Sequence, residues 1–217
     1  VFYSDAGNLV AGDTNGVADV FVRDRVEGTT ERVSVDGAGV QGNKASSTPD
    51  ISADGRYVAF SSAASNLVGG DTNGTTDVFV RDRHTGQTSR VSLANGGTQG
   101  NRYSYRPSIS ADGRYVAFES FATNLVPGDT NGWEDLFVHD RQTHTTERVS
   151  VASDGDAPGA EEPRFGAASE RLAHAAVHGH VALVLEHGGV IAAHHLGRRH
   201  AFRAGLGGLD RGPGRAP

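Results

Sequence analysis

The chain has 217 residues, with 26 acidic and 20 basic side chains and a formal net charge of −6. Residues 1–160 hold 21 of the acids but only 13 of the bases, so no basic stripe is available for a phosphate backbone and no nucleic-acid partner is expected. No apolar run reaches the roughly 18 residues of a membrane span, so we expect no membrane insertion. Cysteine is absent, which excludes disulfides and thiolate chemistry, and 30 glycines with few aromatic residues favour a turn-rich β protein.

The chain begins "VFYSDAGNLV", which reads as the middle of an element. We therefore expect the sequence to be a piece of a longer protein, and no signal peptide is visible in it. The phrase "GDTNGVADVFVRDR" follows at Gly12 and returns in close copies at Gly70 and Gly128. The copies are 58 residues apart, and "RVS" repeats with the same period. A fixed period predicts stacked units of one kind.

Each period is predicted to contain four short strands, here given for the last copy. They are Arg106–Ser110, Arg114–Ser120, Asp135–Asp140 and Thr145–Val151. The second strand alternates apolar with other side chains, which is typical of a strand with one face on a core, and "ADG" at its start is a tight turn. No helical period occurs in residues 1–150. The predicted fold class is all-β, a partial β-propeller of four-stranded antiparallel blades.

The blade boundaries follow from the period. We predict the second half of one blade in residues 1–35 and full blades in 49–92 and 107–150. The segments "PDISADGRYVAFSS" and "DVFVRDRHTGQTSRVS" resemble the TolB-type (WD-like) propeller repeat. The resemblance covers residues 1 to about 150 and implies a propeller, in which Asp77 matches the aspartate that opens a strand and caps its loop. It does not imply a function, because propellers host many functions.

The repeat decays after residue 160. Residues 161–196 are predicted to be a degenerate blade, with strands in "HVALVLE" and "VIAAHH", and residues 197–217 a disordered tail. Two alternatives stay open: a helix from Ser169 to Gly188, or a slipped coding frame. The segment holds seven of the ten histidines, and the zinc-like spacing of His174, His178 and His180 is interpreted as an accident of this composition.

Two long connections are expected to open on the same face of the propeller. They are Phe121–Glu134 and Ala94–Tyr105, whereas the opposite face carries only tight turns. Long loops on a rigid scaffold are common binding sites. Trp133, Tyr103 and Tyr105 place aromatic side chains on this predicted binding face.

The repeated loop also offers oxygen ligands for a cation. Asp71, Asn73 and Asp77 stand at relative positions 1, 3 and 7, a spacing found in calcium loops, although position 5 lacks an acid and the glycine is misplaced. The copies of these candidates are Asp13, Asn15, Asp19, Asp129, Asn131 and Asp135. The alternative is a turn in which Asp and Asn side chains bond their own backbone, and we favour it.

No nucleophile elbow, phosphate loop or zinc-protease motif is present. The leading hypothesis is a non-catalytic binding or scaffold module of a secreted or cell-envelope protein, which presents its long loops to a protein or glycan. It needs no cofactor, apart from a possible Ca²⁺, and its further partners would be the remaining blades of a larger propeller. Two alternatives are a propeller segment of a larger, prolyl oligopeptidase-like hydrolase and a calcium-stabilised surface protein. Because the repeats do not complete a ring, we expect exposed sheet edges and self-association.

Overall fold

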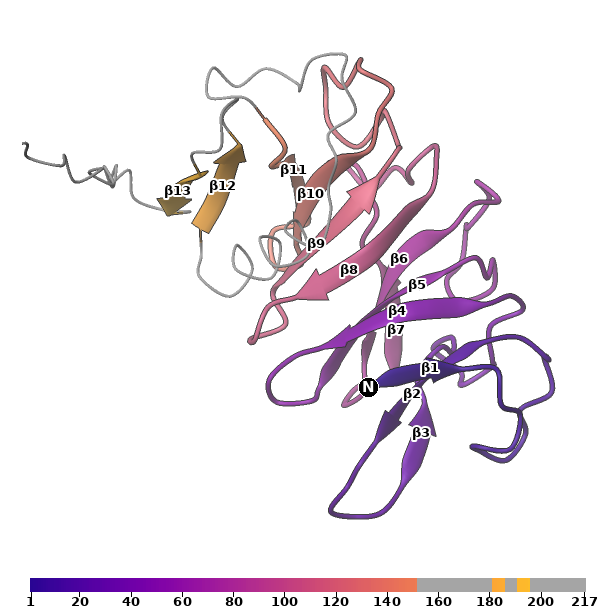
Figure 1. Ribbon diagram of the computed structural model, residues 1–217. Helices are drawn as coiled ribbons and strands as arrows, with labels where there is room; N and C mark the ends of the chain where they lie inside the picture. Colours follow the sequence, from indigo (N-terminus) through magenta and orange to yellow (C-terminus); the bar gives the residue numbers. More distant parts are fainter. Residues whose placement is uncertain (152–180, 186–190, 196–217) are drawn as a thin grey trace, which may run out of the picture.

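A computed structural model of the chain describes residues 1–151, 181–185 and 191–195 (Figure 1). The described residues form antiparallel sheets and no helix. The first blade contains β1 (Phe2–Ser4), β2 (Asp19–Arg23) and β3 (Thr30–Arg32). The second contains β4 (Ser46–Ile51), β5 (Tyr57–Ser62), β6 (Asp77–Asp82) and β7 (Gln87–Arg90). The third contains β8 (Ser104–Ile109), β9 (Tyr115–Ser120), β10 (Asp135–Asp140) and β11 (Thr145–Arg148).

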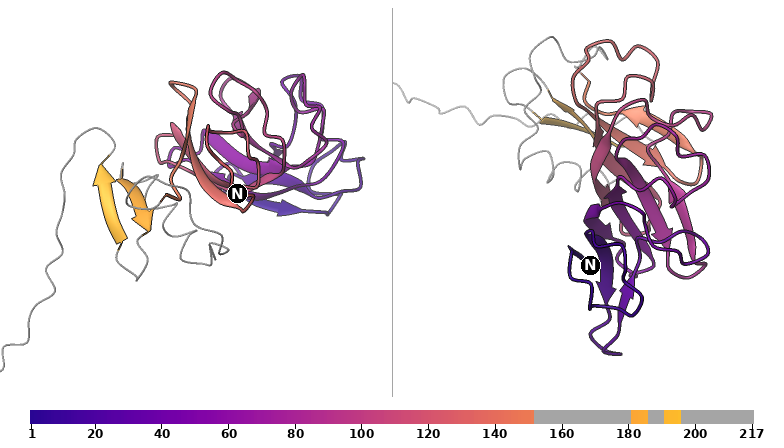
Figure 2. Two further views of the ribbon diagram at one scale, coloured as in Figure 1. Left: turned by 90° about the horizontal axis from the view of Figure 1, so that it is seen from above. Right: turned by 90° about the vertical axis from the view of Figure 1, so that its right-hand side faces the viewer.

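The three sheets are successive blades of a partial β-propeller, arranged as a fan (Figures 1 and 2). The second and third blades have the same strand order and the same register. Even the bulge between β4 and β5, at Ser47 and Asp50, returns between β8 and β9 at Tyr105 and Ser108. The fold class predicted from the 58-residue period is therefore confirmed.

Alternating side chains build the core between adjacent blades. Val78 and Val80 on β6 face Val116 and Phe118 on β9, and all four are 1% exposed or less. In both complete blades one phenylalanine of the second strand stacks on one of the third, as Phe118 does on Phe137 with ring centroids 5.9 Å apart. The alternation in "YVAF" thus buries one set of side chains against one neighbouring blade and the other set against the blade on the opposite side.

The tight "SADG" turn opens the second strand of each complete blade. In the second blade, Ser52 Oγ donates to the Asp54 carboxylate at 2.6 Å and accepts from the Tyr57 amide at 2.9 Å, and Gly55 has φ 72°. The corresponding turn of the third blade lies against the Tyr57 ring. A Cβ on Gly113 would overlap that ring, so glycine is required there both for its positive φ and for space.

The first blade contains three strands where the sequence predicted half a blade. The two predicted strands of the decayed segment are present as the antiparallel hairpin β12 (Val181–Leu185) and β13 (Ile191–His195). The rest of the predicted blade remnant 161–196 and the predicted tail 197–217 lie outside the described residues. No helix of the described residues is long and apolar enough to cross a membrane.

Candidate functional site

The candidate site is the rim formed by the long loops, residues 63–76, 91–103 and 121–134. The loops are joined to one another across blades by amide side chains. Asn73 Nδ2 donates to the Gly100 carbonyl at 2.9 Å, and Asn124 Nδ2 donates to the Gln99 carbonyl at 2.9 Å. These contacts join the long connections to one another.

The repeated phrase forms a compact loop around a buried carboxylate. In the second blade, Asp77 accepts from Ser92 Oγ at 2.6 Å and from Asn73 Nδ2 at 2.9 Å. Arg90 Nη1 lies 3.1 Å from the Asp71 carboxylate and 3.4 Å from that of Asp77. All three charged side chains are at most 9% exposed. One arginine thus contacts both aspartates of the loop and offsets one of their two negative charges.

The same arrangement is present in the other two blades. Arg32 lies 3.2 Å from Asp13 and 3.4 Å from Asp19. The Asp19 carboxylate also accepts from Asn15 Nδ2 at 2.8 Å and from Ser34 Oγ at 2.5 Å. In the third blade the ion pairs are longer. The separations are 3.6 Å for Arg148–Asp129 and 3.7 Å for Arg148–Asp135, and Asn131 Nδ2 lies 3.1 Å from Asp135.

Burial raises the pKa of Asp71 and of Asp129, and the second aspartate of each loop raises it further, whereas the arginine lowers it. One of the two negative charges that would attract a calcium ion is already offset by the guanidinium. In residues 1–151 no three acidic or histidine side chains converge as a metal site would require. The calcium loop and the turn alternative both stay predictions; the bond from the Thr75 amide to Asn73 Oδ1, at 3.0 Å, is of the kind that the turn alternative expects. The arginine of "RVS" repeats with the same period, but the sequence alone did not indicate its partners.

An aromatic cluster distinguishes the third blade. Tyr103 stacks on Tyr105, with ring centroids 5.7 Å apart, and packs against Phe121 at 4.8 Å. Tyr103 is 45% exposed. Trp133 is half-buried on the neighbouring loop, where its amide donates to Asn131 Oδ1 at 3.0 Å. We call Tyr103, Tyr105 and Phe121 the aromatic patch. The second blade has Ala45, Ser47 and Ala63 at the same repeat positions.

An acidic pair lies beneath this patch. The Tyr105 hydroxyl donates to Glu134, and Arg106 Nη1 lies 3.2 Å from the Glu119 carboxylate. Burial, followed by the charge of Glu134, raises the pKa of Glu119 to about 7 against the opposing effect of Arg106. Glu119 is 2% exposed and exchanges its proton near neutral pH. The second blade has Ser61 at this position, so the pair belongs to the third blade alone.

Comparison with known proteins gives neighbours at the level of fold. No protein-family model matches the chain, and no curated protein sequence does. Among solved structures the chain is similar to a putative TolB from Agrobacterium tumefaciens, with a TM-score of 0.41 and 18% identity over 62% of this chain and 42% of that one. It is also similar to TolB from Acinetobacter baumannii, with a TM-score of 0.39 and 18% identity over 67% of this chain and 32% of that one.

A third similar structure is the β-propeller domain of the Trilobed protease from Pyrococcus furiosus. Its TM-score is 0.40 and its identity 14%, over 59% of this chain and 32% of that one. The chain thus spans less than half the length of these structures. The resemblance to TolB-type propellers stands as a likeness of fold, and the hypothesis of a larger hydrolase stays a prediction.

Proposed function

We propose that the chain is a non-catalytic β-propeller module that binds a protein or glycan through its long-loop rim, as part of a secreted or cell-envelope protein. The observation that carries the proposal is the aromatic patch. Three aromatic side chains occupy positions that hold alanine or serine in the otherwise closely repeated second blade.

The patch has the chemistry of a recognition surface. Tyr103 combines an exposed ring with a hydroxyl, and tyrosine of this kind contributes large contact area at low entropic cost. Sugar rings and partner side chains both stack on such faces. The ring is held from below by Tyr105 and Phe121, so little conformational freedom is lost when a partner binds.

The loops around the patch are preorganised. Asn101 lies at the junction of two of them, where its Oδ1 accepts from the Thr123 amide at 3.0 Å and its Nδ2 donates to Thr123 Oγ1 at 3.0 Å. The neighbouring loop is held by the buried aspartate and arginine described above. A rigid scaffold with exposed aromatic side chains supports binding, whereas the repeated Asp and Asn residues are used to shape the loops.

The test uses Trp133, which is the only tryptophan of the chain and lies on the rim. Its fluorescence is followed while a panel of oligosaccharides and candidate envelope proteins is titrated into the chain. For any ligand that binds, Tyr103→Ala is expected to weaken binding at least tenfold, about 1.4 kcal/mol, because the exposed ring is lost. Val26→Ala is the control, since Val26 is 91% exposed in the first blade. A ligand whose affinity is the same for Tyr103→Ala and for the unmodified chain would contradict the proposed face.

A further inference from the structure

In the first two blades a glutamine side chain completes the repeated loop. Gln99 Oε1 accepts from Arg90 Nη1 at 2.9 Å and from the Thr72 amide at 3.3 Å, and its Nε2 donates to Thr72 Oγ1 at 2.6 Å. Gln41 makes the same two bonds to Thr14, at 3.3 Å and 2.7 Å. The loop thus recognises both ends of a primary amide, because it offers donors to the oxygen and an acceptor to the nitrogen.

The loop also contacts the backbone that follows this glutamine. Asn73 Nδ2 donates to the Gly100 carbonyl at 2.9 Å, and Asn15 Nδ2 donates to the Gly42 carbonyl at 3.0 Å. The recognised unit is therefore a Gln-Gly segment, of which the loop binds the side-chain amide and the next carbonyl. A small free amide would offer only the first of these groups.

The third blade retains the geometry of this loop. Gly128 and Gly132 have φ 78° and 72°, against 75° and 70° at the same positions of the second blade. Ser150 Oγ donates to Asp135 Oδ1 at 2.6 Å, as in the equivalent bond of the second blade. Arg148 stands opposite Phe137 in the β10–β11 pair, which is also the register of the second blade. The third loop is therefore built to hold the same unit.

The glutamine itself has no copy in the third repeat. Ala157 stands 58 residues after Gln99 in the sequence, and an alanine side chain cannot supply an amide. The sequence contains two Gln-Gly pairs, 41–42 and 99–100, and each already completes the loop of its own blade. A Gln-Gly segment for the third loop must therefore come from another polypeptide.

Arg148 holds a buried donor without an acceptor. Its side chain is 9% exposed, and among the described residues its Nη1 has no hydrogen-bond partner. This nitrogen lies 3.6 Å from the Asp129 carboxylate and 3.7 Å from that of Asp135, which is longer than a hydrogen bond. The same nitrogen of Arg90 donates to Gln99. Because an unpaired buried donor is unfavourable, a ligand that accepts from Arg148 Nη1 gains affinity by pairing it.

Two further residues of the third loop match those that hold the Gln-Gly segment. Thr130 stands at the position of Thr72 and is exposed, so its amide and hydroxyl lie at the surface of the loop. Asn131 Nδ2 donates to Asp135 at 3.1 Å. Its second N–H group corresponds to the one that Asn73 donates to a glycine carbonyl in the second blade.

We propose that the loop of the third blade binds a Gln-Gly segment of another polypeptide. The glutamine oxygen accepts from Arg148 Nη1 and from the Thr130 amide, and the glutamine nitrogen donates to Thr130 Oγ1. The glycine carbonyl accepts from Asn131 Nδ2. The site lies on the long-loop rim but uses no residue of the aromatic patch, so it does not depend on the function proposed above.

The test is a fluorescence titration of the full chain, because Trp133 is the single tryptophan and its amide donates to Asn131 Oδ1 at 3.0 Å. The probe is the peptide Thr-Gln-Gly-Ala with acetyl and N-methylamide ends, in which glutamine supplies the one primary amide. We expect saturable binding with a dissociation constant of about 1 mM or tighter. The matched peptide Thr-Ala-Gly-Ala should bind at least tenfold more weakly, as should propionamide, which has the amide but no following carbonyl.

Variants of the chain assign the binding to this loop. Thr130→Ala removes the hydroxyl that accepts from the glutamine nitrogen, and it is expected to weaken peptide binding at least threefold. The exposed position makes this variant compatible with folding. Arg148→Lys removes Nη1 while it keeps the charge, and at least tenfold weaker binding is expected. The matched control is Thr14→Ala, at the same position of the first blade, where Gln41 is already bound; it should leave the peptide affinity within twofold.

Three results would each overturn the proposal. The first is a fluorescence signal that does not saturate with Thr-Gln-Gly-Ala up to about 20 mM, well above the weakest affinity expected. The second is equally tight binding of Thr-Ala-Gly-Ala or of propionamide. The third is unchanged peptide binding by Thr130→Ala and by folded Arg148→Lys. None of these results bears on the aromatic patch, which the Tyr103→Ala titration tests separately.

Discussion

At the level of single residues, an arginine stabilises the repeated loop by forming ion pairs with its buried aspartates. Arg90 is the last residue of β7, yet it contacts Asp71, which precedes β6, and Asp77, which begins it. It also donates to Gln99 at 2.9 Å. The pair is buried, so removing one partner leaves uncompensated charge. Arg90→Ala is therefore expected to lower the free energy of unfolding by about 3–5 kcal/mol, measured by urea denaturation. The exposed Arg102 is the control, and Arg102→Ala should change stability by less than about 0.5 kcal/mol.

The same network decides between the turn and the calcium hypotheses. A calcium ion bound at Asp71, Asn73 and Asp77 would stabilise the fold by about 2.7 kcal/mol per site at a hundredfold excess over its dissociation constant. Because Arg90 already supplies positive charge, we expect EDTA to leave the melting temperature of the unmodified chain unchanged. A lower melting temperature with EDTA, reversed by Ca²⁺, would favour the calcium loop instead.

At the level of the element, the turn before β9 links two blades. Gly113→Ala places a Cβ into the Tyr57 ring and also forces alanine to a φ of 72°. Gly55→Ala imposes the same φ in the second blade, but its Cβ would meet nothing closer than Arg83 Nη1 at 3.7 Å. Both variants should lose about 1–2 kcal/mol from the backbone, and Gly113→Ala a further 1–3 kcal/mol from the overlap. If Gly113→Ala and Gly55→Ala lower the free energy of unfolding in urea equally, the contact between the Gly113 turn and the Tyr57 ring contributes nothing to stability.

At the level of the whole molecule, the two complete blades differ in how far their equivalent faces are covered. Val78 and Val80 are 0% and 1% exposed between the second and third blades, whereas Leu136 and Val138, at the same positions of the third blade, are only half-buried. At the other end of the fan Phe2 and Tyr3 of β1 are 37% and 55% exposed. Apolar side chains thus remain accessible on both outer blades.

We expect this chain to self-associate through these surfaces, as light scattering after size-exclusion chromatography would show. Val138→Lys should weaken association at least tenfold, because it places a charge on the apolar face of the third blade. Val26→Lys, at an exposed position of the first blade, is the control for net charge. A monomer at concentrations of about 100 μM, where weak specific contacts form, would overturn the expectation.

The sequence by itself determined the repeat, the strands and the turns, because each depends on residues close along the chain. The alternation in "YVAF" sets which side chains enter a core, and "ADG" sets a turn, whatever lies further away. The period of 58 then implied equivalent blades and a shared face for the long loops. Even the hairpin at 181–195 was predicted by two short apolar runs around a glycine pair.

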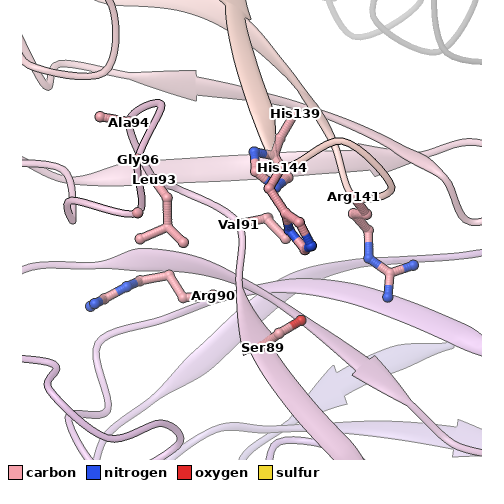
Figure 3. Close-up of a pocket in the computed structure, with 10 residues that line it drawn as sticks. Ser89, Arg90, Val91, Leu93, Ala94, Gly96, His139, Arg141 and His144 are labelled. Carbon is pink, nitrogen blue, oxygen red and sulfur yellow. The ribbon is translucent and has the colours of Figure 1, made fainter.

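Contacts between residues far apart in the chain were decided only by the tertiary structure. The arginine of "RVS" was visible as a repeat, but its pairing with the aspartates of the loop required β6 and β7 to lie side by side. Ser89, Ala94 and His139 stand one repeat period after Glu31, Asp36 and Arg81, which the sequence shows by itself. That they line one cavity between the second and third blades (Figure 3) depends on how two blades pack, because these residues lie too far apart along the chain for a local pattern to bring them together. Interactions between residues close along the chain therefore specified the blade, and packing between blades created the sites.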